Sequence, residues 1–107
     1  MFKGNMAKML KQAQEMQKRI EGVQAELTDT IIEADSGGGM VRIKVNGNLE
    51  LIELDIEPTA LEEDKEIIED LIISAVNKGI SIAQSKSKEK MNSVTGGMLS
   101  GLNIPGM

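Results

Sequence analysis

The fold is decided by residues 40–56, MVRIKVNGNLELIELDI. Apolar and charged side chains alternate from Met40 to Val45, and a second run from Leu49 to Ile56 places Ile52, Leu54 and Ile56 on one face. A period of two residues is typical of a half-buried β-strand. The Asn46-Gly47-Asn48 segment between the two runs favours a tight turn. The segment therefore predicts a β-hairpin with one apolar face.

The turn leaves two possible registers for this hairpin. A turn centred on Asn46-Gly47 would set Ile43 against Glu50. A turn centred on Gly47-Asn48 gives the following pairs: Ile43 with Ile52, Val41 with Leu54, and Arg42 with Glu53. We favour the second register because it matches apolar with apolar residues and opposite charges across the strands.

The other face of the hairpin is expected to mix Arg42 and Lys44 with Leu49 and Leu51. That face is more apolar than solvent exposure requires, which favours partial cover by a second subunit. The seam of the first helix, described next, is a second candidate for the subunit interface. The sequence leaves the choice between them open.

A helix is predicted for residues 6–27, with Asn5 as its N-cap. Apolar residues recur there at spacings of four and three, the rhythm of a helix with a narrow apolar seam. The seam residues are Met9, Ala13, Met16, Ile20, Val23 and Leu27. A seam of this kind requires a partner helix.

The remaining elements complete an α+β domain with the order α-β-β-β-α. β-branched residues from Thr28 to Ile32 predict a first strand, which ends at a glycine turn in residues 35–39. Pro58 ends the sheet, and a C-terminal helix is expected from Asp64, its N-cap, to about Met91. We expect one domain in residues 1–92 and a flexible Gly/Met-rich tail in residues 93–107.

Composition argues against catalysis. The 107 residues include no Cys and no His, so thiolate nucleophiles, disulfides and the commonest general base are excluded. We expect no enzyme activity, cofactor, metal ion or small-molecule substrate. We expect neither a signal peptide nor a membrane-spanning segment, and we expect a cytoplasmic protein. Phe2 is the only aromatic residue, so stacking on single-stranded nucleic acid is not expected.

Charge is distributed unevenly along the chain. The net charge is −5, but the charges are segregated. Residues 1–20 carry five basic residues and one acidic residue, whereas residues 50–70 carry one basic residue and ten acidic residues. Local charge matters more than net charge for docking on DNA. The candidate phosphate contacts are Lys3, Lys8, Lys11, Lys18, Arg19, Lys86, Lys88 and Lys90. Ordinary solvation of helix surfaces is the alternative explanation for these residues.

Several short motifs resemble the YbaB/EbfC family of bacterial nucleoid-associated, DNA-binding proteins, in the order and spacing of that family. They are GNM (4–6), MLKQAQEMQ (9–17), GGMV (38–41), VNG (45–47), LDIEP (54–58), EDLI (69–72), AVNK (75–78), Met91, TGGM (95–98) and PG (105–106). The resemblance covers nearly the whole chain. One departure is Gly79, where the family more often has a small alanine-like residue.

The resemblance implies a homodimer whose projecting helices look like tweezers. It also implies a nucleoid protein that binds double-stranded DNA, alters its conformation and affects gene expression. The basic residues of the two helices would contact phosphates, and the presence of only two Arg indicates low sequence specificity. The competing hypothesis is a protein-interaction module that uses the helical seam and the Met-rich surface.

Overall fold

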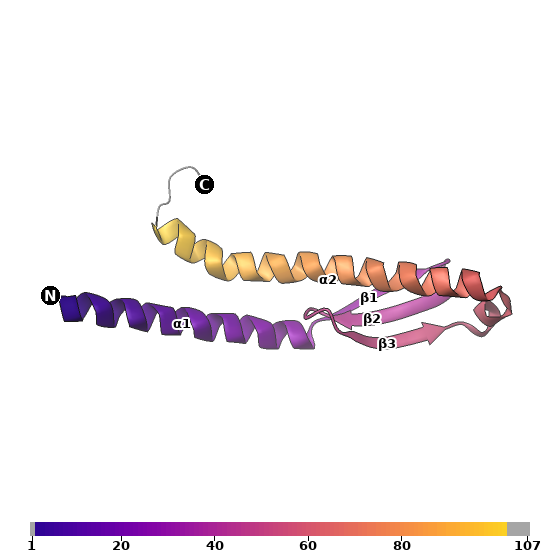
Figure 1. Ribbon diagram of the computed structural model, residues 1–107, viewed down its shortest axis with the longest axis horizontal. Coiled ribbons are helices and arrows are strands. Elements are labelled where there is room, and N and C mark those ends of the chain that lie inside the picture. The colour runs from indigo at the N-terminus through magenta and orange to yellow at the C-terminus, as the bar shows by residue number, and fades with distance from the viewer. Residues whose placement is uncertain (1, 103–107) are drawn as a thin grey trace.

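The chain folds as a helix, a three-stranded antiparallel sheet and a second long helix. The structure is a computed structural model that describes the backbone of residues 2–102 and the side chains of residues 5–94. Its elements are α1 (Phe2–Asp29), β1 (Ile31–Ser36), β2 (Val41–Asn46), β3 (Leu51–Ile56), the short 3-10 helix η1 (Pro58–Glu62) and α2 (Lys65–Leu102). The predicted α-β-β-β-α order is confirmed. The sheet packs along one half of α2, and α1 lies beside the other half (Figure 1).

Both helices are longer than predicted. α1 begins at Phe2, so Asn5 lies inside the helix and is not its N-cap. α2 begins directly after Asp64, as predicted, but continues to Leu102 instead of ending near Met91. Ser and Gly residues lower helix propensity without forbidding the helix.

The predicted boundary between a domain of residues 1–92 and a tail of residues 93–107 falls inside α2. The backbone of residues 93–102 continues this helix, and residues 103–107 lie outside the described residues. The flexibility expected for this segment stays a prediction.

The C-terminal end of α1 is extended by two threonines. The Thr28 hydroxyl donates a hydrogen bond to the carbonyl oxygen of Gln24 at 3.0 Å, and the Thr30 hydroxyl donates one to that of Glu26 at 2.8 Å. Such local bonds allow β-branched threonines to continue and close a helical turn. The first strand therefore begins at Ile31 and not at Thr28, where the sequence pattern placed it.

The sheet has the strand order β1-β2-β3, and both neighbouring pairs are antiparallel. The turn between β1 and β2 contains Gly37, Gly38 and Gly39, whose φ angles are 60°, 66° and 95°. Glycine reaches this left-handed region without the steric cost of a Cβ. The glycine turn predicted from the sequence is confirmed.

The register of the β2–β3 hairpin was predicted wrongly. The structure pairs Val41 with Ile56, Arg42 with Asp55, Ile43 with Leu54, and Lys44 with Glu53. Apolar residues still face apolar residues, and opposite charges still face each other. The third strand is displaced relative to both registers considered from the sequence.

The displacement arises from the buried side chain of Asn46, which organises a longer turn. Its amide oxygen accepts hydrogen bonds from two backbone N–H groups of the turn at 2.9 and 3.0 Å, and its amide nitrogen donates one to Glu50 Oε1 at 2.8 Å. Leu49 adopts a φ of 66° within this turn. An irregularity in the ladder follows, where Val45 pairs with Leu51. Asn is a known turn former, but its presence alone does not fix the length of the turn.

The core lies between α2 and one face of β1 and β2. Its buried residues are Ile32, Ala34, Val41, Ile43, Val45, Ala75 and Ala83. α2 approaches the sheet closely at the buried Gly79. A Cβ at this position would overlap Cδ1 of Ile43 and would lie 3.4 Å from Cγ2 of Val45. Close packing therefore explains why this position of α2 is a glycine.

β3 is the strand that α2 leaves largely uncovered. Leu51 and Leu54 pair with buried residues of β2 and share their face, yet they are 49% and 44% exposed. Leu51 was predicted to lie on the other face, and this prediction is wrong. The other face instead carries ion pairs of Lys44 with Glu33 at 3.7 Å and with Glu53 at 3.4 Å. The apolar surface that the sheet leaves open is the β3 part of its core face.

Replacing Gly79 with valine is expected to lower the free energy of unfolding by about 1–3 kcal/mol, because the larger side chain overpacks a tight core. The control is Gly22→Ala in α1, where no atom lies within 4 Å of the added Cβ. This change is expected to raise the free energy of unfolding by about 0.5–1 kcal/mol. Chemical denaturation measures both values. Wild-type stability of Gly79→Val would contradict the close helix–sheet packing.

Candidate nucleic-acid interface

α1 is joined to the sheet at its C-terminal end. Leu27 is 1% exposed, and it alone is buried among the α1 side chains that the structure describes. The backbone N–H of Gly47, in the β2–β3 turn, donates to the carbonyl oxygens of Leu27 at 2.8 Å and Thr30 at 3.1 Å. A Cβ at Gly47 would lie 2.8 Å from the Leu27 carbonyl oxygen. The turn and the helix end can approach this closely because residue 47 has no side chain.

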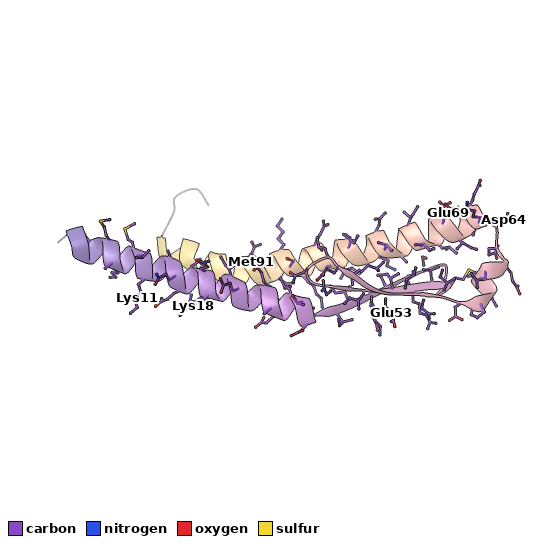
Figure 2. The ribbon with its side chains drawn as sticks, turned by 60° about the horizontal axis from the view of Figure 1, so that its bottom comes forward. Lys11, Lys18, Glu53, Asp64, Glu69 and Met91 are labelled. Carbon is purple, nitrogen blue, oxygen red and sulfur yellow. The ribbon has the colours of Figure 1, made fainter. Side chains whose placement is uncertain are left out.

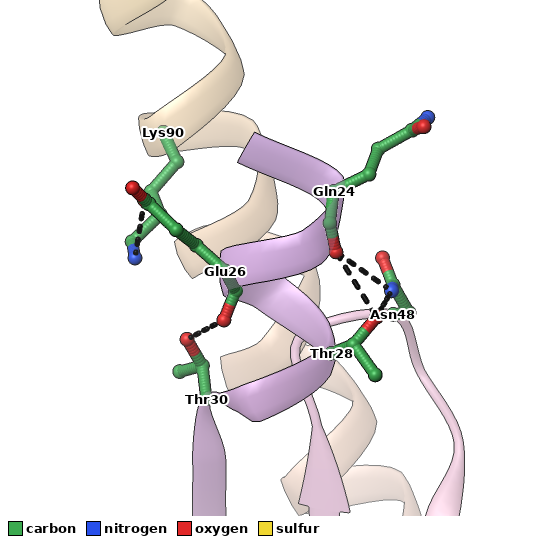
Figure 3. Close-up of polar contacts among 6 residues, drawn as sticks. All are labelled: Gln24, Glu26, Thr28, Thr30, Asn48 and Lys90. Atoms are coloured by element: carbon green, nitrogen blue, oxygen red, sulfur yellow. Dashed lines mark hydrogen bonds and ion pairs between the residues drawn. The ribbon is translucent and has the colours of Figure 1, made fainter. Parts of the chain in front are cut away.

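The side chain of Asn48, in the same turn, binds the last two turns of α1 (Figure 3). Asn48 Nδ2 donates to the carbonyl oxygen of Gln24 at 3.2 Å and to the Thr28 hydroxyl oxygen at 2.5 Å. The Leu27 carbonyl group, in the last turn of α1, lacks an i+4 partner within the helix, and the Gly47 N–H supplies one. Gly47 and Asn48 together tie the hairpin to the helix end and fix the direction in which α1 leaves the sheet. The Asn-Gly-Asn motif indicated a turn, but this second role was missed from the sequence.

Beyond this junction α1 runs antiparallel to the C-terminal half of α2 (Figure 1). The seam residues Ile20 and Val23 are half-buried. Lys90 Nζ of α2 lies 3.5 Å from Glu26 Oε2 of α1. α2 is therefore a partner helix for this part of the predicted seam. The cover ends toward the N-terminus, where Met9 is 68% exposed.

Three of the candidate lysines form a stripe along α1. At about 100° per residue, Lys11 and Lys18 fall opposite the apolar seam, and Lys8 lies on the same side about 100° from Met9. All three are exposed. We call these three residues the basic stripe. Figure 2 shows Lys11 and Lys18 projecting from α1 on the side away from α2. Arg19 borders the stripe, and Glu15 is an acidic residue within it.

The other candidate residues are not gathered on one face. The backbone of Lys3 belongs to α1, and its side chain is among those that the structure does not describe. Lys86 and Lys88 are exposed on α2, but they are two residues apart and therefore point about 200° away from each other. Lys90 is half-buried and forms the ion pair with Glu26 (Figure 3). The geometry thus favours the α1 lysines over those of α2.

Basic and acidic side chains are separated along the molecule, whose longest dimension is 73 Å. Glu53, Asp64 and Glu69 lie on the half that contains the sheet, whereas Lys11 and Lys18 lie on the other half (Figure 2). The basic residues of the β2 strand are paired with carboxylates within the sheet half. In the part of the chain whose side chains are described, the basic stripe makes no ion pair. Its charge therefore remains available to an anionic partner.

No metal site or membrane-crossing element is found in the described part of the chain. Within residues 5–94, the His, Cys, Asp and Glu side chains form no group placed to hold a metal ion. No helix among the described residues combines the length and the apolar character needed to cross a membrane.

The fold and the stripe define a small α+β protein with a basic helical arm. The chain belongs to the YbaB/EbfC DNA-binding family, whose model matches residues 2–98. The resemblance inferred from the sequence motifs is confirmed.

Two relatives and one solved structure illustrate this membership. The chain is 43% identical over 101 residues to a nucleoid-associated protein of Legionella pneumophila, covering 94% of this chain and 87% of the relative. A nucleoid-associated protein of Alkaliphilus metalliredigens is also 43% identical, over 104 residues, with 96% and 88% covered. The crystal structure of the uncharacterized protein HP0035 from Helicobacter pylori is 31% identical. It matches with a TM-score of 0.75 over 87% of this chain and 95% of that chain.

Proposed function

We propose that this protein is a nucleoid-associated protein that binds duplex DNA through the basic stripe, with little base readout and no chemical step. The observation that carries this proposal is that Lys8, Lys11 and Lys18 share one exposed face of α1, away from the acidic half of the molecule. Lysine contacts with phosphates supply the sequence-independent part of DNA affinity. A local basic surface of this kind supports DNA binding in spite of the negative net charge.

The spacing of the stripe suits a phosphate backbone. Lys8 and Lys11 are about 4.5 Å apart along the helix axis, and Lys11 and Lys18 about 10.5 Å apart, at 1.5 Å per residue. Phosphates on one strand of B-DNA recur about every 3.4 Å along the duplex axis. Each lysine can therefore reach a separate phosphate of the same duplex.

Low sequence specificity follows from the side chains that are available. The chain has two Arg, and Arg42 lies in the sheet, 3.7 Å from the carboxylate of Glu57. Arg19 is thus the one arginine near the stripe, and the bidentate contact with guanine that arginine provides is scarce. Together with the family membership, these features support a protein of the cytoplasmic nucleoid that alters DNA conformation, nucleoid organisation and gene expression.

We further propose that the protein works as a homodimer joined at the uncovered core face of β3. Leu51 and Leu54 are 49% and 44% exposed there. Exposed apolar side chains on the core face of a sheet are typical of an interaction site. A second copy brings the same surface, so the two patches can cover each other across a twofold axis. The dimer then presents two basic stripes to DNA.

The second candidate function is a protein-interaction module that docks another protein on the helical seam and the Met-rich surface. The observation that favours it is the open N-terminal part of the seam, where Met9 is largely exposed. Under this function Met9→Ser with Met16→Ser would reduce partner binding, and charge reversal of the stripe would matter less.

Fluorescence anisotropy with duplexes of unrelated sequence, across a salt series, tests DNA binding. We expect similar affinities for all duplexes and a slope of log K against log salt of about −4 to −5, because four to six phosphates are neutralised per dimer. The double variant Lys8→Glu with Lys11→Glu is expected to lose measurable binding. Salt-independent binding would contradict a mechanism based on phosphate contacts.

A matched control reverses two charges on the other half of the molecule. Lys65→Glu with Lys78→Glu changes the net charge by the same amount at exposed positions of α2 beside the sheet. This control is expected to bind DNA nearly as tightly as the wild type, because screening weakens its effect on a distant interface. Equal losses in the two double variants would show that net charge, and not the stripe, governs binding.

Light scattering coupled to gel filtration tests the homodimer. Leu54→Glu is expected to convert the dimer to a monomer, because it buries a charge in an apolar interface. The control is Glu53→Gln. Glu53, the neighbouring residue of β3, lies on the charged face, so this change is expected to leave the dimer intact. A Leu54→Glu protein that stays dimeric would place the interface elsewhere.

A further inference from the structure

An apolar surface at the N-terminal end of α1 is not covered by any residue whose side chain the structure describes. Met6 is 70% exposed, Met9 68% and Leu10 62%, and Ala13 lies beside them on the helix. We call these four residues the open seam. Met6, Met9 and Ala13 continue, at spacings of three and four residues, the same seam that α2 covers further along α1. The open seam is therefore an extension of an existing helix–helix interface.

The open seam and the basic stripe occupy opposite faces of α1. Lys8 lies two residues from both Met6 and Leu10, which is about 200° around the helix. Lys11 lies two residues from Met9 and shows the same relation. DNA bound to the stripe would therefore leave the open seam facing away from that duplex.

We propose that the open seam pairs with the open seam of a second copy, so that two arms pack together and hold two DNA duplexes on their outer faces. This proposal rests on the proposed function, because it takes DNA binding by the stripe as given. It adds an interface distinct from the dimer contact at β3, and it makes the protein a bridge between duplexes. Pairing buries the apolar residues of both arms and leaves both basic stripes outside.

The flanks of the open seam favour a second copy as its partner. Residues that border an apolar helix seam set partner choice through their charges. Asn5, Gln12 and Gln17, which border this seam, are uncharged, and Lys3 is the one charged residue at a flanking position, so two identical arms meet with little like-charge repulsion. Identical apolar faces are also self-complementary across a twofold axis. An isolated helix segment of about a dozen residues is marginal in water, and pairing would stabilise it.

A bridging assay tests the proposal, with Met6→Gln combined with Met9→Gln as the seam variant. Duplex DNA fixed on beads captures a second, fluorescent duplex through the protein, and anisotropy measures the affinity for a single duplex. The seam variant is expected to keep its affinity for a single duplex. It is expected to capture the second duplex at least about tenfold less than the wild type, because it lacks two anchors of the arm interface. Lys8→Gln with Lys11→Gln is expected to lose both activities.

The control Leu61→Gln with Ile67→Gln removes two exposed apolar side chains from the acidic half and is expected to bridge like the wild type. The proposal is overturned if the seam variant bridges normally or if the wild type binds DNA without bridging. It is also overturned if the seam variant loses single-duplex affinity and bridging by the same factor, because the seam would then contact DNA itself.

Sedimentation velocity without DNA separates this proposal from the proposed function. The wild type is expected to form species larger than a dimer as its concentration rises, whereas the seam variant stays a dimer. If the wild type shows this association but binds no DNA, the proposed function fails and arm pairing stands. If the wild type binds DNA but the seam variant associates like the wild type, arm pairing fails and the proposed function stands.

Discussion

The contact between the end of α1 and the β2–β3 turn determines the direction of the basic arm relative to the sheet. Gly47 approaches the Leu27 carbonyl oxygen closely and donates a hydrogen bond to it, and Asn48 binds the Gln24 carbonyl oxygen one turn earlier. The helix is thereby capped and directed away from the sheet. A chain with a net charge of −5 can thus present a basic arm at one end, while most of its carboxylates lie at the other. Local field, and not total charge, governs docking on a polyanion.

The element order could be predicted because several local signals agreed. Alternation in residues 40–56, the glycine turn before it and the seam of α1 each indicated one kind of element. The hairpin register could not be predicted, because it depends on the buried Asn46 side chain and on the turn that this side chain closes. The end of α1 was misplaced because threonine hydroxyls can bond within a helix as well as favour a strand.

The candidate interface could be predicted as a set of lysines but not as a surface. Sequence spacing places Lys8, Lys11 and Lys18 on one face of a helix, and the structure leaves that face open. The role of Lys90 depends on where α1 packs against α2, because only that packing brings it to Glu26. The open apolar face of β3 could not be predicted either, because its residue pattern does not indicate that α2 covers only the other two strands.

Amide chemical shifts of the nitrogen-15-labelled protein, followed by NMR during titration with a short duplex, test the central claim most directly. Under the proposed function, DNA lies on the basic stripe, away from the acidic half. We expect the largest shift changes around Lys8, Lys11 and Lys18, with little change near Glu53 and Asp64. Changes centred on the charged face of the sheet, or saturating binding that leaves α1 unperturbed, would contradict it.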